Sequence, residues 1–177
     1  PATPALTATR ATTVTPTLVP TPLPPVPTEA PTPVPTDTPR PGISGEVHAR
    51  FGDFAELVSY SLPATEVTPT EPLALTLYWR GLEGTSPLDY LVFTHLISED
   101  GRLIAQHDGA PAGGTRPITG WEAGEMIEDP HPMTFYDNTY NGSATIVVGL
   151  YDPATGRVST ATGADSAVLP TTITVVP

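Results

Sequence analysis

The stretch that decides the fold is "LALTLYWRG", residues 73–81. Its large apolar side chains recur at every second position and share one face of an extended chain: Leu73, Leu75, Leu77 and Trp79. A period of two is typical of a half-buried β-strand, whereas a helix would repeat every three to four residues. The sequence therefore predicts a strand with one face against a hydrophobic core.

Short β-rich runs separated by turn residues continue on both sides of this strand. The run 90–97, "YLVFTHLI", is apolar on both faces, which predicts a central strand. No segment has a convincing amphipathic helical pattern. Eight or nine strands over 43–177 predict an all-β fold, an antiparallel sandwich of immunoglobulin-like or jelly-roll-like outline. The remaining predicted strands are "EVHARF" (46–51), "AELVSYSL" (55–62), "RLIAQH" (102–107), "ATIVVGLY" (144–151), "RVST" (157–160) and "TTITVV" (171–176).

Composition changes sharply at Gly42, because 13 of the 24 prolines precede it. We therefore divide the chain into a Pro/Thr-rich extended arm or linker, 1–42, and a β-sandwich domain, 43–177. Proline favours polyproline II, so about 40 residues at about 3.1 Å each would reach about 130 Å when fully extended. A stiff spacer is the simplest interpretation, and its Thr residues are candidates for O-glycosylation.

One window of the arm does not fit a pure spacer. "ALTATRATTVT", residues 5–15, contains no proline and lies between Pro4 and Pro16. Its free N–H groups and β-branched side chains suit addition to the edge of another sheet. It is therefore a candidate donor strand, and the residues assigned to this assembly arm are Thr7, Thr9, Ala11, Thr13, Val14 and Thr15.

Charge and composition exclude several classes of protein. The net charge is −12, with seven Arg and no Lys, so we expect no nucleic-acid partner and no anionic membrane surface as partner. The absence of Cys excludes disulfides and thiolate chemistry. The chain has only one Gln and two Asn, and such a scarcity of heat-labile side chains suggests a warm habitat. No run is long enough for a membrane span, and no signal peptide is present. Because a tail rich in Pro and Thr is typical of extracytoplasmic proteins, we expect a mature extracellular or cell-surface product whose export signal has been removed or left out.

The glycine-rich stretch "QHDGAPAGGTRP", 106–117, resembles an active-site loop at first sight. It leads into no predicted helix that could bind a phosphate, and its glycines suit turns between strands. His107 and Asp108 would need a nucleophile, and no Ser lies in a nucleophile elbow. The four His residues are scattered, which argues against zinc. We predict that the protein is not an enzyme.

The acidic run 122–132 offers weak calcium candidates, namely Glu128 and Asp129, with Asp137 just beyond it. Their spacing matches no calcium-loop pattern, so we expect no cofactor and keep calcium as the weaker alternative. Pro130 and Pro132 instead predict a proline-interrupted edge strand.

Aromatic residues near loops provide another candidate site. Trp121, Tyr136 and Tyr140 could stack on the apolar face of a sugar, or Trp121 and Tyr136 could instead plug the ends of the sandwich. Asn141 begins an Asn-Gly-Ser sequon, a weak glycosylation signal because Asn-Gly also suits a hairpin turn.

Five motifs in order resemble a known but uncharacterised domain family: "FGDFAELVSYSL", "LTLYWRG", "DYLVFTHLISEDGRLIAQHDGAP", "GWEAGE" and "VGLYDPATGRV". That family is an extracytoplasmic immunoglobulin-like β-sandwich of filamentous, often thermophilic bacteria. It follows Pro/Thr-rich linkers or lies C-terminal to membrane proteins that resemble glycosyltransferases. The resemblance covers Ile43 to about Val176 and implies fold and compartment, but no catalytic residues.

Two functions remain open at this point. We favour a non-enzymatic structural subunit of an extracellular filament or cell-surface array, which would polymerise with copies of itself by adding its arm to a neighbour's sheet. The alternative is a surface-displayed carbohydrate-binding or adhesion module, held on a Pro/Thr stalk, whose partner is a cell-surface glycan.

Overall fold

The computed structural model describes residues 42–177, so the predicted assembly arm, Thr7 to Thr15, lies outside the described residues. The described chain is all-β, with ten strands instead of the eight or nine expected. The strand of the described chain that was not anticipated is β3, which has two residues, too few to show a period of two. The strand predicted at 157–160 is represented by the two-residue β9, which begins at Gly156 and ends at Arg157. The elements are β1 (Ile43–Phe51), β2 (Ala55–Leu62), β3 (Glu66–Val67), β4 (Leu73–Gly81), β5 (Leu91–Ser98), β6 (Leu103–Gly109), η1 (Pro111–Gly114), η2 (Ile118–Gly120), β7 (Met126–Phe135), β8 (Gly142–Asp152), β9 (Gly156–Arg157) and β10 (Ala167–Val175).

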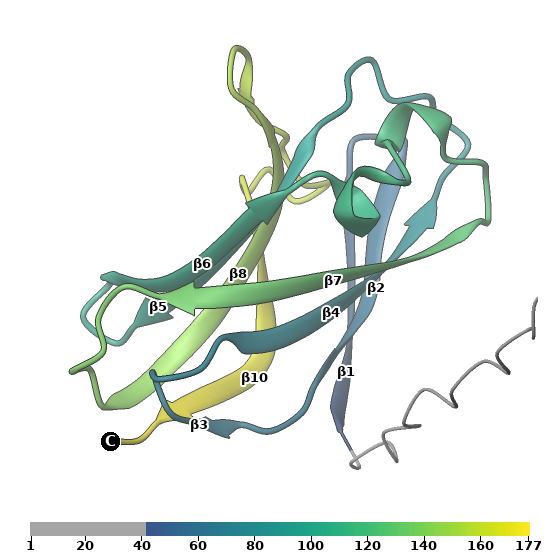
Figure 1. Ribbon diagram of the computed structural model, residues 1–177. Coiled ribbons are helices and arrows are strands. Elements are labelled where there is room, and N and C mark those ends of the chain that lie inside the picture. Colours follow the sequence, from purple (N-terminus) through teal and green to yellow (C-terminus); the bar gives the residue numbers. More distant parts are fainter. Residues whose placement is uncertain (1–41) are drawn as a thin grey trace, which may run out of the picture. The chain divides into compact units, whose positions relative to one another are not determined.

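The strands form one curled mixed sheet in the order β1-β2-β4-β7-β6-β5-β8-β10-β3, with β9 paired to β8 (Figure 1). All pairs are antiparallel except β10–β3. Strand β7 connects the two halves of the curl, because residues 126–133 pair with β4 and Thr134 and Phe135 pair with β6. A single long strand therefore passes from one half of the sheet to the other.

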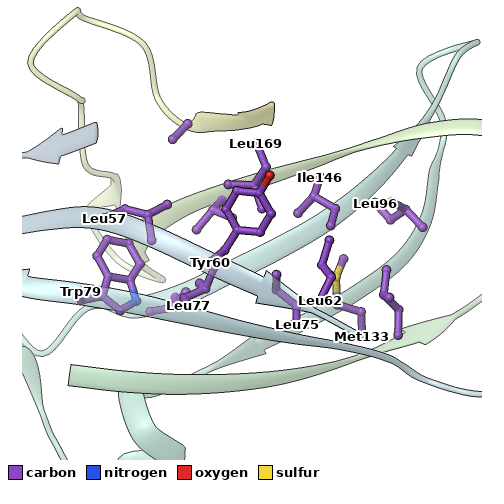
Figure 2. Close-up of a cluster of buried hydrophobic side chains, with 14 of the residues drawn as sticks. Leu57, Tyr60, Leu62, Leu75, Leu77, Trp79, Leu96, Met133, Ile146 and Leu169 are labelled. Carbon is purple, nitrogen blue, oxygen red and sulfur yellow. The ribbon is translucent and has the colours of Figure 1, made fainter. Parts of the chain in front are cut away.

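Strand β4 has the faces that its sequence predicts. Leu73, Leu75, Leu77 and Trp79 are all buried, and the residues between them are exposed or half-buried. Figure 2 shows Leu75, Leu77 and Trp79 near Tyr60 of β2, together with apolar residues from β5, β7, β8 and β10. Burying a Leu or Phe side chain fully is worth roughly 1.5–3 kcal/mol, so this shared core is the main source of stability.

Strand β5 is central, as predicted, because it pairs with β6 on one side and β8 on the other. The glycine-rich segment after β6 forms the turns that the sequence suggests, here the short 3-10 elements η1 and η2. In η1, Ala112 and Gly113 have φ angles of 51° and 62°, which make a tight left-handed turn. Across residues 42–177, no helix has the length and hydropathy that crossing a membrane requires.

Candidate functional site

One open feature of the described chain is a seam between β1 and β10. Among the described strands, β1 pairs only with β2, and β10 pairs with β8 and, at Thr174 and Val175, with β3. At one end the seam is closed, since Phe51 forms a bridge with Thr160 and Ala161 N–H donates to the Arg50 carbonyl. Beyond that end, both strands present backbone edges without a partner strand in the described chain, and such edges can accept another strand.

A groove of about 330 Å³ lies in this seam. It is lined by residues of β1 and β10 and by the loop before β10, including Val47, Ala49, Thr160, Ala167 and Val168. Val47 and Ala49 face the core but are only half-buried, and Val168 is 62% exposed. The groove therefore combines backbone edges with apolar side chains that remain in contact with water.

Tyr60 closes the core beneath the seam. Its ring passes directly under Gly45 of β1, where a Cβ atom would lie 2.7 Å from a ring carbon. Its hydroxyl hydrogen-bonds the Thr171 hydroxyl of β10, and Figure 2 shows this oxygen directed toward Leu169 of the same strand. A side-chain hydrogen bond that passes beneath β1 thus links β2 to β10, while the backbones of β1 and β10 stay unpaired at this point.

Other features discourage pairing elsewhere along the edges. Strand β7 lies between β4 and β6 in the sheet, so the predicted edge strand is correct only for 126–133, where the side away from β4 has no partner strand in the described chain. This part carries Pro130 and Pro132, and proline has no N–H to donate. Strand β1 has a bulge between Glu46 and Ala49, where His48 adopts a φ of 55°. A bulge limits non-specific pairing but leaves the regular edge 43–46 unaltered.

A buried polar network lies on the inner face of β7. Asp129 is 0% exposed, and its carboxylate accepts hydrogen bonds from Trp79 Nε1 at 3.1 Å and from the Ala112 backbone N–H at 2.8 Å. His131, 1% exposed, lies 2.8 Å from the same carboxylate through Nε2. Its Nδ1 lies 2.8 Å from Nδ1 of His107 on β6. The network joins β4, β6, β7 and η1 through polar contacts.

The direction of these hydrogen bonds follows from the chemistry of the groups. A carboxylate oxygen accepts, so the tautomer of His131 that carries its proton on Nε2 donates to Asp129, and its Nδ1 then accepts from His107 Nδ1–H. Burial lowers the pKa of His107 and neighbouring His131 acts in the same direction, whereas Asp108 and Asp129 oppose the shift. A similar relay can serve a general base, but here each acceptor oxygen of Asp129 also holds a structural donor.

The lowered pKa values predict an acid-sensitive domain. Burial also lowers the pKa of His95 on β5, aided by Arg157 and opposed by Asp108. Between these lowered values and the ordinary value of about 6.5, the unfolded chain binds more protons, so stability falls as pH decreases below about 6.5. We expect the melting temperature to drop between pH 7.5 and 5.5, and less steeply in His107→Asn, which keeps a donor near the Nδ1 position. An equal drop in both proteins would contradict the role of His107.

The calcium candidates are not brought together. Asp129 points into the core, and Glu128 is exposed on the opposite face of β7. Asp137 accepts from Arg102 at 2.9 Å and from the Thr139 N–H and hydroxyl, which lower its pKa to about 2. Among the residues that the structure describes, no group of three or more His, Asp or Glu side chains is arranged to hold a metal ion.

The three loop aromatics do not form one surface. Trp121 is buried, packs 6.1 Å from Trp79 and donates from Nε1 to the Arg116 carbonyl, as expected of a core plug. Tyr136 follows the other end of β7 and is 60% exposed. A ten-residue strand spans roughly 30 Å, so one sugar ring cannot contact both. Tyr140 donates to the Ser143 carbonyl and lies below Arg102, and Asn141 is exposed just before β8.

Sequence reasoning missed the roles of the residues that organise these features, although it named Asp129 as a calcium candidate. Asp129 and His131 are two apart on a strand, which places them on one face, and this spacing was the available signal for the network. The roles of Tyr60 and Gly45 depend on the distant strand β10, so they have no local signal. Comparison with models of known protein families, with curated proteins and with solved structures gave no match to this chain.

Proposed function

We propose that the protein is a non-enzymatic subunit of an extracellular filament or cell-surface array, in which the arm of one copy adds as a strand to the β1–β10 seam of the next. The observation that carries this proposal is the seam itself: two long strands whose facing edges are open above an apolar groove. Strand addition supplies the missing backbone partners and covers the exposed apolar side chains.

The arm window fits this seam in length and chemistry. Window 5–15 has eleven residues without proline, and β1 and β10 have nine each. One face of the window carries Leu6, Ala8 and Val14, small enough to contact the half-buried Val47 and Ala49. Arg10, the only charged residue of the window, lies on the same face. The length of the window and its small apolar side chains therefore support this pairing.

The contact would be heterologous, since an arm meets a seam. When the same contact is repeated from copy to copy, it gives a closed ring if the rotation between neighbouring copies returns to the first copy, and an open fibre if it does not. The proline-rich remainder of the arm, 16–41, could extend about 80 Å as polyproline II, enough to reach a neighbouring copy. Copies could thus connect without a large contact between their domains.

Proline substitution tests whether the window pairs. Thr9→Pro with Thr13→Pro removes two ladder donors, and we expect complete loss of filaments or arrays in negative-stain electron microscopy. The melting transition of the domain should be unchanged. The matched control is Thr17→Pro with Thr21→Pro, in the segment that already contains proline, and it should assemble normally. Assembly by the window variant would refute strand addition by the arm.

The docking position has a direct chemical test because the chain contains no cysteine. With Thr9→Cys and Ser44→Cys in one chain, oxidation should produce a ladder of disulfide-linked oligomers in a non-reducing gel. Thr9→Cys with Met126→Cys places the second thiol on an exposed position of β7 and should give no ladder. Equal ladders from both pairs would show that the seam is not the docking position.

The finer fold and the compartment belong to the same proposal. We propose that the curled sheet is an immunoglobulin-like sandwich, with β1-β2-β4 facing β6-β5-β8-β10 across the core. We also propose membership of the extracytoplasmic domain family that the five motifs resemble, with its surface location and thermophilic setting. The packing of side chains from both halves into one core supports the sandwich.

The alternative, a displayed glycan-binding module, retains one observation in its favour. Tyr136 presents an exposed ring beside the turn that contains Asp137 and Thr139. A single ring is a small platform, so loss of glycan retention on an array in Tyr136→Ala is the test of this alternative.

A further inference from the structure

Phe93 is buried on the side of the sheet that faces away from the core. Its exposed fraction is 2%, yet it is not part of the main core cluster. Along β5, Val92, Thr94 and Leu96 point inward and Phe93 and His95 point outward, consistent with the alternation of a strand. A large aromatic ring on an outer sheet face must be covered by something other than the core.

Two features provide this cover. The Arg157 guanidinium, from β9, lies 4.3 Å from the centre of the Phe93 ring. Gly149 of β8 is the cross-strand partner of Phe93, and a Cβ atom there would lie 2.4 Å from the ring. The glycine therefore lets the ring lie flat across β8, and the β9 hairpin holds Arg157 above it.

An open pocket of about 300 Å³ adjoins this ring. Two more rings line it, since His95 and Tyr151 lie 4.8 Å and 6.1 Å from Phe93, centre to centre. The other lining residues are Asp108, Asp152, Pro153, Gly156 and Arg157. The pocket thus combines half-exposed aromatic walls with a few polar groups, the usual composition of a small-molecule site.

The polar groups differ in how far they are already engaged. Arg157 pairs with Asp165 at 2.9 Å, and Asp152 accepts from the Ala154 and Thr155 N–H groups of its own turn. The Asp108 carboxylate lies 3.6 Å from His95 Nε2, beyond ordinary hydrogen-bond distance. A carboxylate has two oxygens that can each accept more than one hydrogen bond, so Asp108 keeps acceptor capacity for a ligand. Burial raises the pKa of Tyr151, and the carboxylate of Asp108 and its contact with the Tyr151 hydroxyl act in the same direction.

We propose that this outer-face pocket binds a neutral sugar ring. The apolar face of a pyranose would stack on Tyr151 and His95, and its hydroxyl groups would donate to Asp108 and accept from Arg157. The volume is at the lower end of the ~300–1,000 Å³ range of ligand sites, which suits one ring rather than a long chain. Asp108, Asp152 and Asp165 outnumber Arg157, so acidic sugars are repelled. This site is separate from the seam and does not depend on assembly.

Titration followed by NMR tests the proposal. Full-length protein, made as Thr9→Pro with Thr13→Pro so that it stays monomeric, is mixed with methyl glucoside, methyl mannoside, methyl galactoside or glucuronate up to 100 mM. We expect at least one neutral glycoside to shift the signals of Phe93, His95 and Tyr151, with glucuronate at least tenfold weaker. Tyr151→Ala and Asp108→Asn should each weaken binding at least tenfold, and Tyr136→Ala should leave it unchanged.

Each remaining outcome counts against the site. Shifts that persist in Tyr151→Ala and Asp108→Asn would place binding elsewhere, and shifts lost only in Tyr136→Ala would assign it to the loop. No shifts with any neutral glycoside would reject sugar recognition by this pocket. Asn has nearly the same shape as Asp, and Asp108 lies on the exposed end of β6, so the Asp108→Asn protein should fold normally. It therefore still tests the site if Tyr151→Ala is poorly folded.

Discussion

Replacing Asp129 by alanine is expected to lower the free energy of unfolding by about 3–5 kcal/mol, the range seen when one partner of a buried polar or charged pair is removed. The substitution leaves Trp79 Nε1–H, His131 Nε2–H and the Ala112 N–H without their acceptor inside the protein. Each buried donor left unsatisfied costs roughly 1–3 kcal/mol, so the three losses together account for the size of the effect. Urea denaturation followed by Trp fluorescence measures it, because Trp79 is one of two tryptophans.

The neighbouring residue supplies the control for this measurement. Glu128→Ala changes an exposed carboxylate on the other face of the same strand, and its effect should stay within about 0.5 kcal/mol. The loss of unfolding free energy in Asp129→Asn should lie between those of Asp129→Ala and Glu128→Ala. An amide oxygen can still accept from one or two of the three donors. Equal stability of the Asp129→Ala and Glu128→Ala proteins would mean that the network contributes nothing to folding.

Substitution of Gly81 by alanine should destabilise the domain by about 1–3 kcal/mol, the usual cost of overpacking a filled site. A Cβ atom at this position would lie 2.2 Å from the Glu122 carbonyl oxygen, which is a backbone atom and cannot rotate away. The same glycine donates to the Glu125 carbonyl at 2.9 Å and accepts from the Gly124 N–H at 2.8 Å. The loop that seats Trp121 would therefore have to move.

Thermal unfolding and the fluorescence of Trp121 should report this movement together. Gly120→Ala is the matched control, because no atom lies within 4 Å of its added Cβ and its backbone is not left-handed. It should melt within a degree or two of wild type. A Gly81→Ala protein with wild-type melting and emission would show that the loop adapts without cost.

Local patterns predicted the parts of the fold that depend on local geometry. The alternation in residues 73–81 identified both faces of β4, and Pro130 and Pro132 identified the open side of β7. These predictions are correct because both signals are local. The two faces of a strand follow from its own residues, and each proline lacks an N–H whatever the rest of the chain does. Strand β3 has no such pattern, since two residues cannot define a period.

The site features depend on residues that are distant in sequence. Trp79 and Asp129 are fifty positions apart, and Tyr60 and Thr171 are 111 apart, so only the strand order brings them together. The same reason explains why the sequence left two roles open for Trp121, since the ring that packs against it, Trp79, lies far away in sequence. The sequence placed Phe93 in a central strand but could not show that it faces away from the core, because both faces of that run are apolar.

The direct join between the arm and β1 has a mechanical consequence. The arm ends at Gly42 and β1 begins at Ile43, so tension carried by the arm enters the domain at an edge strand. Seven residue pairs hold β1 to β2 in antiparallel register, and the Phe51–Thr160 bridge anchors its far end. A pull along the strand axis loads all these hydrogen bonds in shear at once, which resists rupture better than peeling them one by one. In the proposed filament, strand β1 at the edge of the sheet would therefore be the first element of the domain to bear the load.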